Sequence, residues 1–156
     1  MIFFKRKKQP KMTDSLTGLH NRDYFHYTFG ELSQIESTEF KTMAVFDIDH
    51  FKAANDLIDG DKALLDVVHL AQEAIAGQGD LMRWGGDEFM VMVKMPPKEA
   101  LQAFKQFVRN VEEQTPVTVS VGLVAIRTED TIKTNYYRAV QRCYLVKEMG
   151  GNGVKL

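Results

Sequence analysis

Two adjacent carboxylates follow two adjacent glycines in the stretch Gly85-Gly86-Asp87-Glu88. Apolar segments flank this stretch, a pattern typical of a β-hairpin tip, where glycine adopts positive φ without steric cost. The missing side chains also allow a ligand to approach the backbone closely. Two like charges at one turn repel each other, and a bound metal ion is the simplest compensation. A solvated acidic turn without any ligand is the alternative.

The elements that position these groups follow from the periodicity of apolar residues. The sequence predicts helices at about 21–34, 50–56, 60–76, 98–114 and 132–149, and strands at 42–46, 81–84, 89–93, 117–126 and 154–156. The expected apolar faces comprise Tyr24, Phe25, Phe29 and Leu32 in the first helix, and Tyr136, Ala139, Val140, Cys143 and Tyr144 in the last. An ion pair between Asp14 and Arg22 is expected across the turn before the first helix.

From Thr42 onward the order is strand, helix, hairpin, helix, strand, which is the ferredoxin-like plan. The predicted fold class is α+β, a central antiparallel sheet flanked by helices, with a βαββαβ core and an N-terminal helix. In this plan the first strand pairs with the second hairpin strand, so Asp47 is expected beside Asp87 and Glu88. This geometry favours the divalent-metal site over the solvated turn. Oxygen ligands without a histidine favour Mg²⁺ over Zn²⁺.

Mg²⁺ held by carboxylates usually binds substrate phosphates, and a pair of ions can activate the attacking oxygen and stabilise the leaving one. The turn Ile48–Lys52 offers backbone N–H groups at a helix start, where phosphate binds well. Lys52 and Lys147 are candidate counter-charges, although a lone lysine is more often a solvated surface residue. Asn55 and Asp61 are candidates for reading a base edge. The alternatives are a helix cap for Asn55 and a first-turn acid for Asp61.

The composition sets the broad class. The 156 residues suffice for one domain with a core, and 44% hydrophobic with 26% charged residues is typical of a soluble globular protein. A net charge of −1 gives no argument for nucleic-acid binding. The single cysteine, Cys143, excludes an internal disulfide, so a reducing, cytoplasmic location is expected. No apolar run approaches the roughly 20 residues of a transmembrane segment. Residues 1–12 are expected to be a flexible basic tail and 13–156 one domain.

Several motifs occur together in an order that resembles the GGDEF domain, the diguanylate cyclase family, from about Thr13 to the C-terminus. They are Asp14-x-Leu16-Thr17-Gly18-Leu19-x-Asn21-Arg22, Phe46-Asp47-Ile48-Asp49-His50-Phe51-Lys52-x-x-Asn55-Asp56, Gly60-Asp61-x-x-Leu64, Arg83-Trp84-Gly85-Gly86-Asp87-Glu88-Phe89, Ser120-x-Gly122 and Ala139-x4-Tyr144-x-x-Lys147-x-x-Gly150-x-Asn152. The signature pentapeptide alone would be a weak signal, whereas the ordered set is specific.

The resemblance implies a nucleotide-cyclase palm that condenses two GTP molecules into cyclic di-GMP, a bacterial second messenger, and releases two pyrophosphates. Each domain of a homodimer would hold one GTP, and each 3′-hydroxyl would attack the α-phosphate held by the partner. Two Mg²⁺ ions per site, replaceable by Mn²⁺, would be held by Asp47, Asp87, Glu88 and the carbonyl of Ile48. Glu88 would also assist deprotonation of the 3′-hydroxyl.

The resemblance also assigns substrate contacts. Phe51, Lys52 and Lys147 would hold the triphosphate, and Asn55 and Asp61 would hydrogen-bond guanine. A buried acceptor facing guanine would reject adenine, because polar groups would otherwise remain unpaired. Asp49 is expected to point the other way from Asp47, so a structural role is expected for it.

The chain departs from the family pattern at three places. Only Leu57-Ile58-Asp59 separates the Asn-Asp pair from the Gly-Asp pair, where the family usually has a longer loop. Gly77-Gln78-Gly79-Asp80 lacks the arginine of the product-inhibition motif, so no such site is expected. Gly151 stands where an arginine often contacts phosphate, and a lost contact of that kind costs about 1.5–3 kcal/mol.

These departures keep two alternatives open. One is a catalytically weak or inactive domain that serves as a GTP-binding, regulatory interaction module. The other is a cyclase with relaxed base specificity. A separate regulatory or sensory protein is a candidate partner in each case, and nucleic acid is not an expected one.

Overall fold

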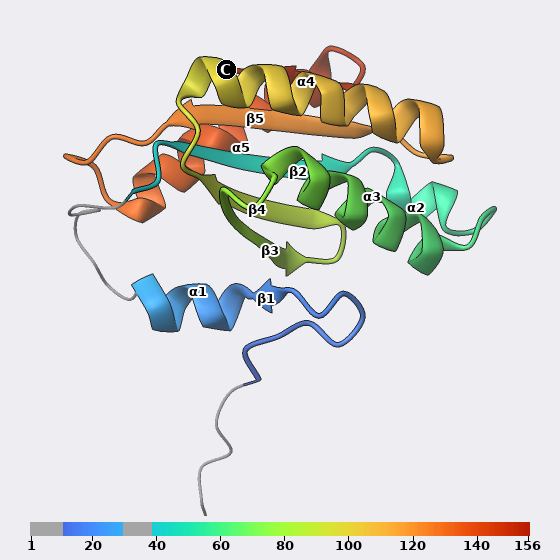
Figure 1. The fold of residues 1–156 in the computed structure, drawn as a ribbon. Helices are drawn as coiled ribbons and strands as arrows, with labels where there is room; N and C mark the ends of the chain where they lie inside the picture. Colours follow the sequence, from blue (N-terminus) through green and yellow to red (C-terminus); the bar gives the residue numbers. More distant parts are fainter. Residues whose placement is uncertain (1–10, 30–38) are drawn as a thin grey trace, which may run out of the picture.

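A computed structural model describes residues 11–29 and 39–156, whose strands form one six-stranded sheet in the order β1-β3-β4-β2-β5-β6 (Figure 1). The strands are β1 (His20–Asn21), β2 (Thr42–Ile48), β3 (Gly79–Gly85), β4 (Glu88–Val93), β5 (Val119–Ala125) and β6 (Gly153–Lys155). The helices are α1 (Arg22–Phe29), α2 (Phe51–Ala54), α3 (Gly60–Ile75), α4 (Pro97–Gln114) and α5 (Ile132–Glu148). The expected tail lies outside the described residues up to residue 10.

The four central strands confirm the ferredoxin-like plan. β2 lies between β4 and β5 and is antiparallel to both. The predicted central antiparallel sheet is confirmed, and the structure adds parallel pairs at both edges, where β1 pairs with β3 and β6 pairs with β5. β6 is parallel because α5 carries the chain back to the start of β5 before β6 forms. β1 has two residues, too few for any periodicity in the sequence.

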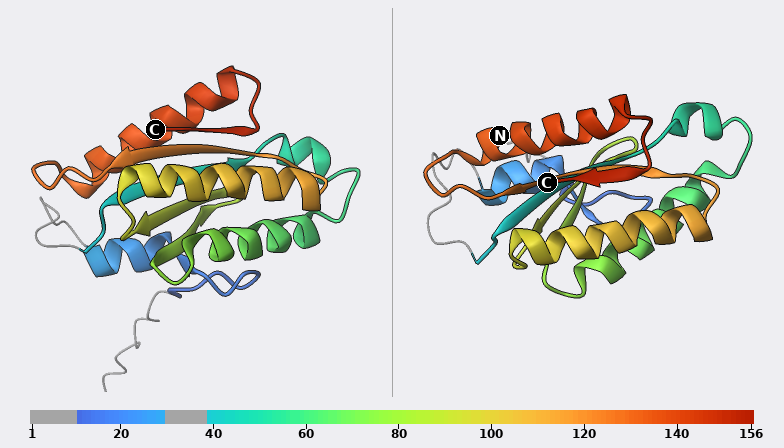
Figure 2. Two further views of the ribbon diagram at one scale, coloured as in Figure 1. Left: turned by 45° about the horizontal axis from the view of Figure 1, so that its top comes forward. Right: turned by 90° about the horizontal axis from the view of Figure 1, so that it is seen from above.

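Helices cover both faces of the sheet, with α3 and α4 side by side on one face and α5 on the other (Figure 2). Strand alternation sends Phe46 and Phe89 to the α3–α4 face, where their rings stack at 4.9 Å between centroids. Met43, Val45 and Met90 point to the opposite face, in a second apolar cluster with residues of α1 and α5. The residues that continue this second series toward the end of β2 therefore face α5.

A close approach of backbones fixes α5 against the sheet. A Cβ atom at Gly122 of β5 would lie 2.1 Å from the carbonyl oxygen of Ala139 and 2.4 Å from the nitrogen of Cys143. Only a residue without a side chain fits there. Asn135, fully buried, pins the first turn of α5 by hydrogen bonds to the backbone of Arg127 and Thr131.

The predicted helices at 60–76, 98–114 and 132–149 are confirmed to within one residue at each end. α1 begins at Arg22, and its predicted extension to Gln34 falls outside the described residues. Tyr144 was placed wrongly on the apolar face, since its side chain is 59% exposed. The buried positions of α5 are spaced three or four residues apart and include Cys143, so the next residue points away.

None of the helices in residues 11–29 and 39–156 is long and apolar enough to span a membrane.

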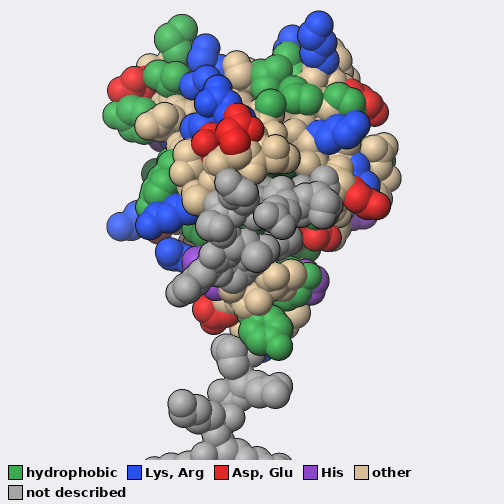
Figure 3. All heavy atoms as spheres, turned by 90° about the vertical axis from the view of Figure 1, so that its left-hand side faces the viewer, with side chains coloured by type: hydrophobic (Ala, Val, Ile, Leu, Met, Phe, Trp, Pro, Cys, Tyr) green, Lys and Arg blue, Asp and Glu red, His purple; other side chains and the backbone are tan. Residues whose placement is uncertain are grey.

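At one end of the sheet the hairpin tip between β3 and β4 lies on the same side as α2 and the end of β2 (Figure 1). The opposite end carries acidic and basic side chains intermixed with apolar ones (Figure 3). The candidate carboxylates Asp47, Asp87 and Glu88 lie at the hairpin-tip end of the sheet.

Candidate active site

Asp47 and Glu88 are direct partners across the β2–β4 ladder. Both belong to alternating series that point to the α5 face: Asp47 follows Met43 and Val45 on β2, and Glu88 precedes Met90 on β4. Asp47 stays within the ladder because β2 continues to Ile48, two residues beyond its predicted end. The expectation that the ferredoxin-like plan brings these two carboxylates together is confirmed.

Asp87 lies in the turn that leads into β4, and its carbonyl accepts a 3.2 Å hydrogen bond from the Ile48 N–H. Burial and the nearby Asp87 carboxylate raise the pKa of Asp47 to about 7, against the opposing effect of Lys147. An ion pair alone would lower this pKa. The direction therefore shows that burial and the Asp87 carboxylate together outweigh the effect of the Lys147 ammonium on the pKa of Asp47.

Lys147 reaches the same group from α5. Its Nζ forms an ion pair with Oδ2 of Asp47. The other oxygen, Oδ1, is buried and has no hydrogen-bond partner in the described part of the chain. A buried carboxylate oxygen without a donor is costly, and a bound cation would satisfy it. Of the two lysines considered from the sequence, Lys147 thus lies at the carboxylates.

Glu88 has a partner that the sequence did not suggest. The Tyr136 hydroxyl on α5 donates a 2.6 Å hydrogen bond to Oε1 of Glu88. Burial and the Glu88 carboxylate raise the pKa of Tyr136, so the hydroxyl keeps its proton. Helical spacing assigned Tyr136 to the apolar face of the last helix. Spacing alone does not reveal which group a tyrosine hydroxyl contacts.

In residues 11–29 and 39–156 no group of three or more His, Cys, Asp and Glu side chains is arranged to hold one metal ion. Asp47 and Glu88 instead contact Lys147 and Tyr136. The unpartnered oxygen of Asp47 beside the Asp87 carboxyl nevertheless fits an oxygen-preferring divalent cation. The donor set is thus present, although the structure does not gather all three carboxylates around one point.

The turn after β2 uses part of its backbone for the sheet. The N–H groups of Ile48 and Asp49 donate to the carbonyls of Asp87 and Thr118, so they are not available to a phosphate. His50 adopts the left-handed conformation, with φ 52°, before the four-residue α2. The Phe51 side chain packs partly against the core, and Lys52 is exposed. The expected backbone contacts to phosphate are therefore restricted to residues after Asp49.

The short connection between α2 and α3 sets Asn55 against the start of α3. A Cβ at Gly60 would lie 1.6 Å from Oδ1 of Asn55, so the Asn55 side chain keeps this position only while residue 60 is glycine. Asp59 caps α3, and its side chain accepts a 3.1 Å hydrogen bond from the Lys62 N–H. This leaves Asp61 exposed in the first turn, adjacent in sequence to the glycine that Asn55 contacts. The two expected base-reading residues are brought to one helix start.

Asp49 takes a structural position. Its carboxylate accepts hydrogen bonds from the Thr118 hydroxyl at 2.7 Å, the Ser120 hydroxyl at 2.6 Å and the Asn152 N–H at 2.8 Å. It thereby ties the end of β2 to β5 and to the turn after α5. Gly151 lies against it, with φ +76° and a hypothetical Cβ 2.8 Å from Oδ2 of Asp49.

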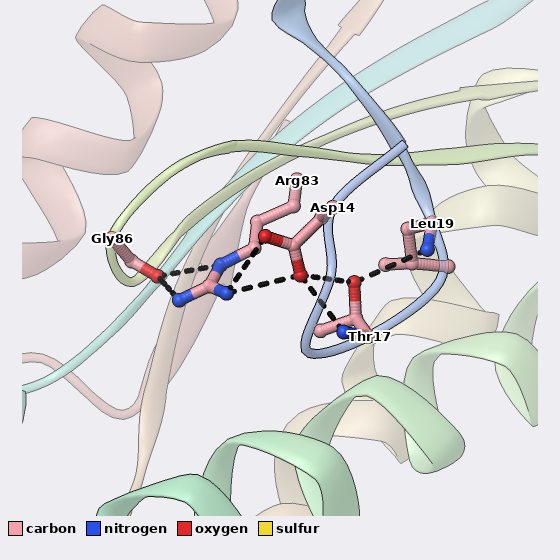
Figure 4. A network of polar contacts seen from close by, with 5 residues as sticks. All are labelled: Asp14, Thr17, Leu19, Arg83 and Gly86. Atoms are coloured by element: carbon pink, nitrogen blue, oxygen red, sulfur yellow. Dashed lines mark hydrogen bonds and ion pairs between the residues drawn. The ribbon is translucent and has the colours of Figure 1, made fainter. Parts of the chain in front are cut away.

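Arg83 joins the hairpin tip to the N-terminal segment (Figure 4). Its Nε and Nη2 donate to the Gly86 carbonyl at 2.9 and 2.7 Å, and its Nη1 lies 3.1 Å from both oxygens of Asp14. The predicted pair of Asp14 with Arg22 is therefore wrong. The β1–β3 pairing places Asn21 opposite Arg83, whereas the Arg22 guanidinium lies over the Trp84 ring at 5.3 Å.

Comparison with known proteins bears on this arrangement. A sequence model described as "Diguanylate cyclase, GGDEF domain" matches residues 11–153. The probable diguanylate cyclase DgcT of Escherichia coli K12 is 34% identical over 160 residues, which cover 90% of this chain. The chain spans only 34% of the length of that relative.

Two solved structures share the fold. The coiled coil and GGDEF domain of DgcB from Caulobacter crescentus, in complex with c-di-GMP, has 25% identity and a TM-score of 0.81, covering 92% of this chain and 84% of that one. The diguanylate cyclase SiaD from Pseudomonas aeruginosa, in complex with its activator SiaC, has 25% identity and a TM-score of 0.76, covering 92% and 61%.

Proposed function

Since the chain belongs to the GGDEF, diguanylate cyclase, family, we propose that it condenses two GTP molecules into cyclic di-GMP and releases two pyrophosphates. The observation that carries this proposal is the buried, unpartnered oxygen of Asp47 beside a second carboxylate, with Lys147 adjacent. Such a site suits a divalent cation together with the phosphates that the cation accompanies.

Asp47, Asp87, Glu88 and the carbonyl of Ile48 would hold the metal. Two Mg²⁺ ions, or Mn²⁺ in their place, would supply charge neutralisation at the triphosphate and activation of the attacking 3′-hydroxyl. Glu88 would accept the proton of that hydroxyl. Catalysis would then depend on positioning the 3′-hydroxyl of one GTP against the α-phosphate of the other, and on electrostatic stabilisation.

The remaining residues of the site would bind GTP. Lys147 would exchange its partner Asp47 for a phosphate oxygen when the cation occupies the carboxylates. Phe51 and Lys52 would hold the triphosphate from the turn after β2. Asn55 and Asp61 would hydrogen-bond the guanine edge from the start of α3, where the Asn55 side chain lies against Gly60.

Condensation of two GTP molecules needs two domains that face each other, so we propose a homodimer as the active form. The reaction would take place in the cytoplasm, where GTP is supplied. A separate activator protein would be a further partner, by analogy with SiaD, which was crystallised with SiaC. Residues 13–156 would form the catalytic domain, preceded by a basic tail.

A second function has its own support. The ion pair of Lys147 with Asp47 and the bond of Tyr136 to Glu88 occupy two of the three carboxylates. A domain that binds GTP without turning it over, and acts on a partner protein, would be consistent with this. A cyclase with relaxed base choice is a further variant, since the connection that carries Asn55 and Asp61 is short.

The test is incubation of the protein at several concentrations with GTP and Mg²⁺, followed by chromatography of nucleotides and measurement of pyrophosphate. We expect two pyrophosphates per cyclic di-GMP and a rate that rises faster than linearly with protein concentration. Tight GTP binding without product in the wild type would favour the binding module. Equal incorporation of ATP and GTP in a competition would favour relaxed base choice.

A further inference from the structure

We propose that Tyr136 is a positioning residue for Glu88: its hydroxyl holds the carboxylate in one orientation and leaves the second oxygen to the cation and the substrate. The inference rests on the proposed function of this site and adds a residue to it. The 2.6 Å hydrogen bond from the Tyr136 hydroxyl to Oε1 of Glu88 links α5 to β4 across 48 residues. Oε2 accepts no hydrogen bond from the described part of the chain.

The tyrosine is itself held in place. Its backbone lies next to Asn135, whose buried amide is bonded to the Arg127 and Thr131 carbonyls. Its ring lies 5.0 Å from that of Trp84, between centroids, at an interplanar angle of 32°. A side chain constrained at its backbone, ring and hydroxyl imposes its position on the group that it binds.

Trp84, which contacts Tyr136, is in turn packed against residues of the N-terminal helix α1. The Trp84 ring packs edge-on against Phe25 at 5.0 Å and lies under the Arg22 guanidinium at 5.3 Å. Trp84 directly precedes the two glycines of the hairpin tip. Glu88 is thus oriented by an aromatic stack that includes residues of α1, β3 and α5.

A hydrogen bond of this kind matters because glutamate has three rotatable bonds and would otherwise sample several orientations. Partners that orient metal ligands typically change metal affinity or activity by about 10–100-fold when they are removed. Phenylalanine in place of Tyr136 would keep the ring and its contact with Trp84 and remove only the hydroxyl. The neighbouring Tyr137 offers a matched control, since its side chain is 53% exposed and its ring has the same size.

The experiment compares Y136F with Y137F and the wild type in two measurements. The first is the affinity for Mn²⁺ alone, from quenching of the fluorescence of Trp84, the single tryptophan of the chain. The second is kcat and KM for GTP. We expect Y136F to bind Mn²⁺ about tenfold more weakly and to lose about tenfold in kcat, with KM within about twofold. Y137F should match the wild type, and all three should have similar melting temperatures.

Equal Mn²⁺ affinity and kcat in Y136F and Y137F would overturn the proposal, as would tighter Mn²⁺ binding by Y136F or no Mn²⁺ binding by the wild type. If the wild type turns over no GTP, the proposed function fails. The Mn²⁺ affinities then decide the role of Tyr136 on their own, because that measurement needs no turnover.

Discussion

Lys147 on α5 forms an ion pair with Asp47 at the end of β2, across 100 residues of sequence. The pair joins the helix that carries the candidate phosphate ligand to the strand that carries the candidate metal ligand. If Asp47 holds a cation as proposed, Lys147 would compete with that cation for Asp47 in the absence of nucleotide. This relationship gives the first prediction.

Replacing Lys147 by methionine should affect cation and nucleotide in opposite directions. K147M should bind Mn²⁺ more tightly without nucleotide, because a competing positive charge is removed. Its KM for GTP should rise about tenfold to a hundredfold, the value of a hydrogen bond between charged groups. Titration calorimetry with Mn²⁺ and steady-state kinetics measure the two effects. K133M, at the start of α5, is the control, and an unchanged KM in K147M would argue against a phosphate role.

The contact between β5 and α5 predicts that Gly122 tolerates no side chain. G122A should lower the free energy of unfolding by about 1–3 kcal/mol, because the added methyl group meets the backbone of α5. Urea denaturation measures the loss. G85A is the control, since a Cβ at Gly85 meets no atom within 4 Å. Equal stability of the two variants would show that α5 does not lie as close to β5 as described.

Asp14 predicts a pH-dependent contribution to stability. Burial opposes its ionisation, but hydrogen bonds from Thr17 and Arg83 outweigh burial and hold the pKa of the carboxyl below its usual 3.8. Because the folded pKa is the lower one, ionised Asp14 stabilises the protein above about pH 4, and this is lost as the pH falls through the folded pKa.

D14N should therefore be less stable than the wild type by about 1.5–3 kcal/mol at pH 7, the range for a hydrogen bond to a charged group. The difference should shrink below about pH 4, where the wild-type carboxyl becomes protonated. Thermal unfolding between pH 3 and pH 7 gives the comparison. D23N, which changes an exposed aspartate of α1, is the control. A difference that stays constant over this pH range would contradict the assigned ion pair.

The conformation of Gly151 predicts what happens when the arginine that the family often has at this position is introduced. Because this residue has φ +76° and lies against Asp49, any side chain there is strained. G151A should cost about 1–2 kcal/mol of stability, and G151R should not lower the KM for GTP. G150A shares the positive φ without a close neighbour and separates backbone strain from the contact with Asp49. A lower KM in stable G151R would show that the turn adapts.

The sequence predicts the core of this fold well because its signals are local. Helical spacing in α3 and α4, and the glycine pair flanked by apolar segments, determine the elements and their order. The order then brings Asp47 and Glu88 together, because the ferredoxin-like plan fixes which strands are neighbours. β1 was not predicted, since its two residues are too few to carry a pattern. β6 was predicted at 154–156, but its parallel pairing with β5 was not.

The finer features of the site depend on side-chain reach between distant elements. Asp14 pairs with Arg83 and not with Arg22, because the β1–β3 register places the N-terminal segment beside the hairpin. From its spacing alone Tyr136 is predicted to be one more apolar residue of α5. Its hydrogen bond to Glu88 becomes evident only from the position of α5 relative to β4. Sequence spacing gives the face of a helix but not its distance from the neighbouring strand.

The most direct test is the mass of the nucleotide product formed from GTP and Mg²⁺ by the wild type and by E88Q, which keeps the shape of Glu88 and removes its charge. We predict cyclic di-GMP from the wild type and none above background from E88Q. Unreacted GTP with the wild type at high protein concentration, or equal product from both proteins, would contradict the claim that these carboxylates join two molecules of GTP.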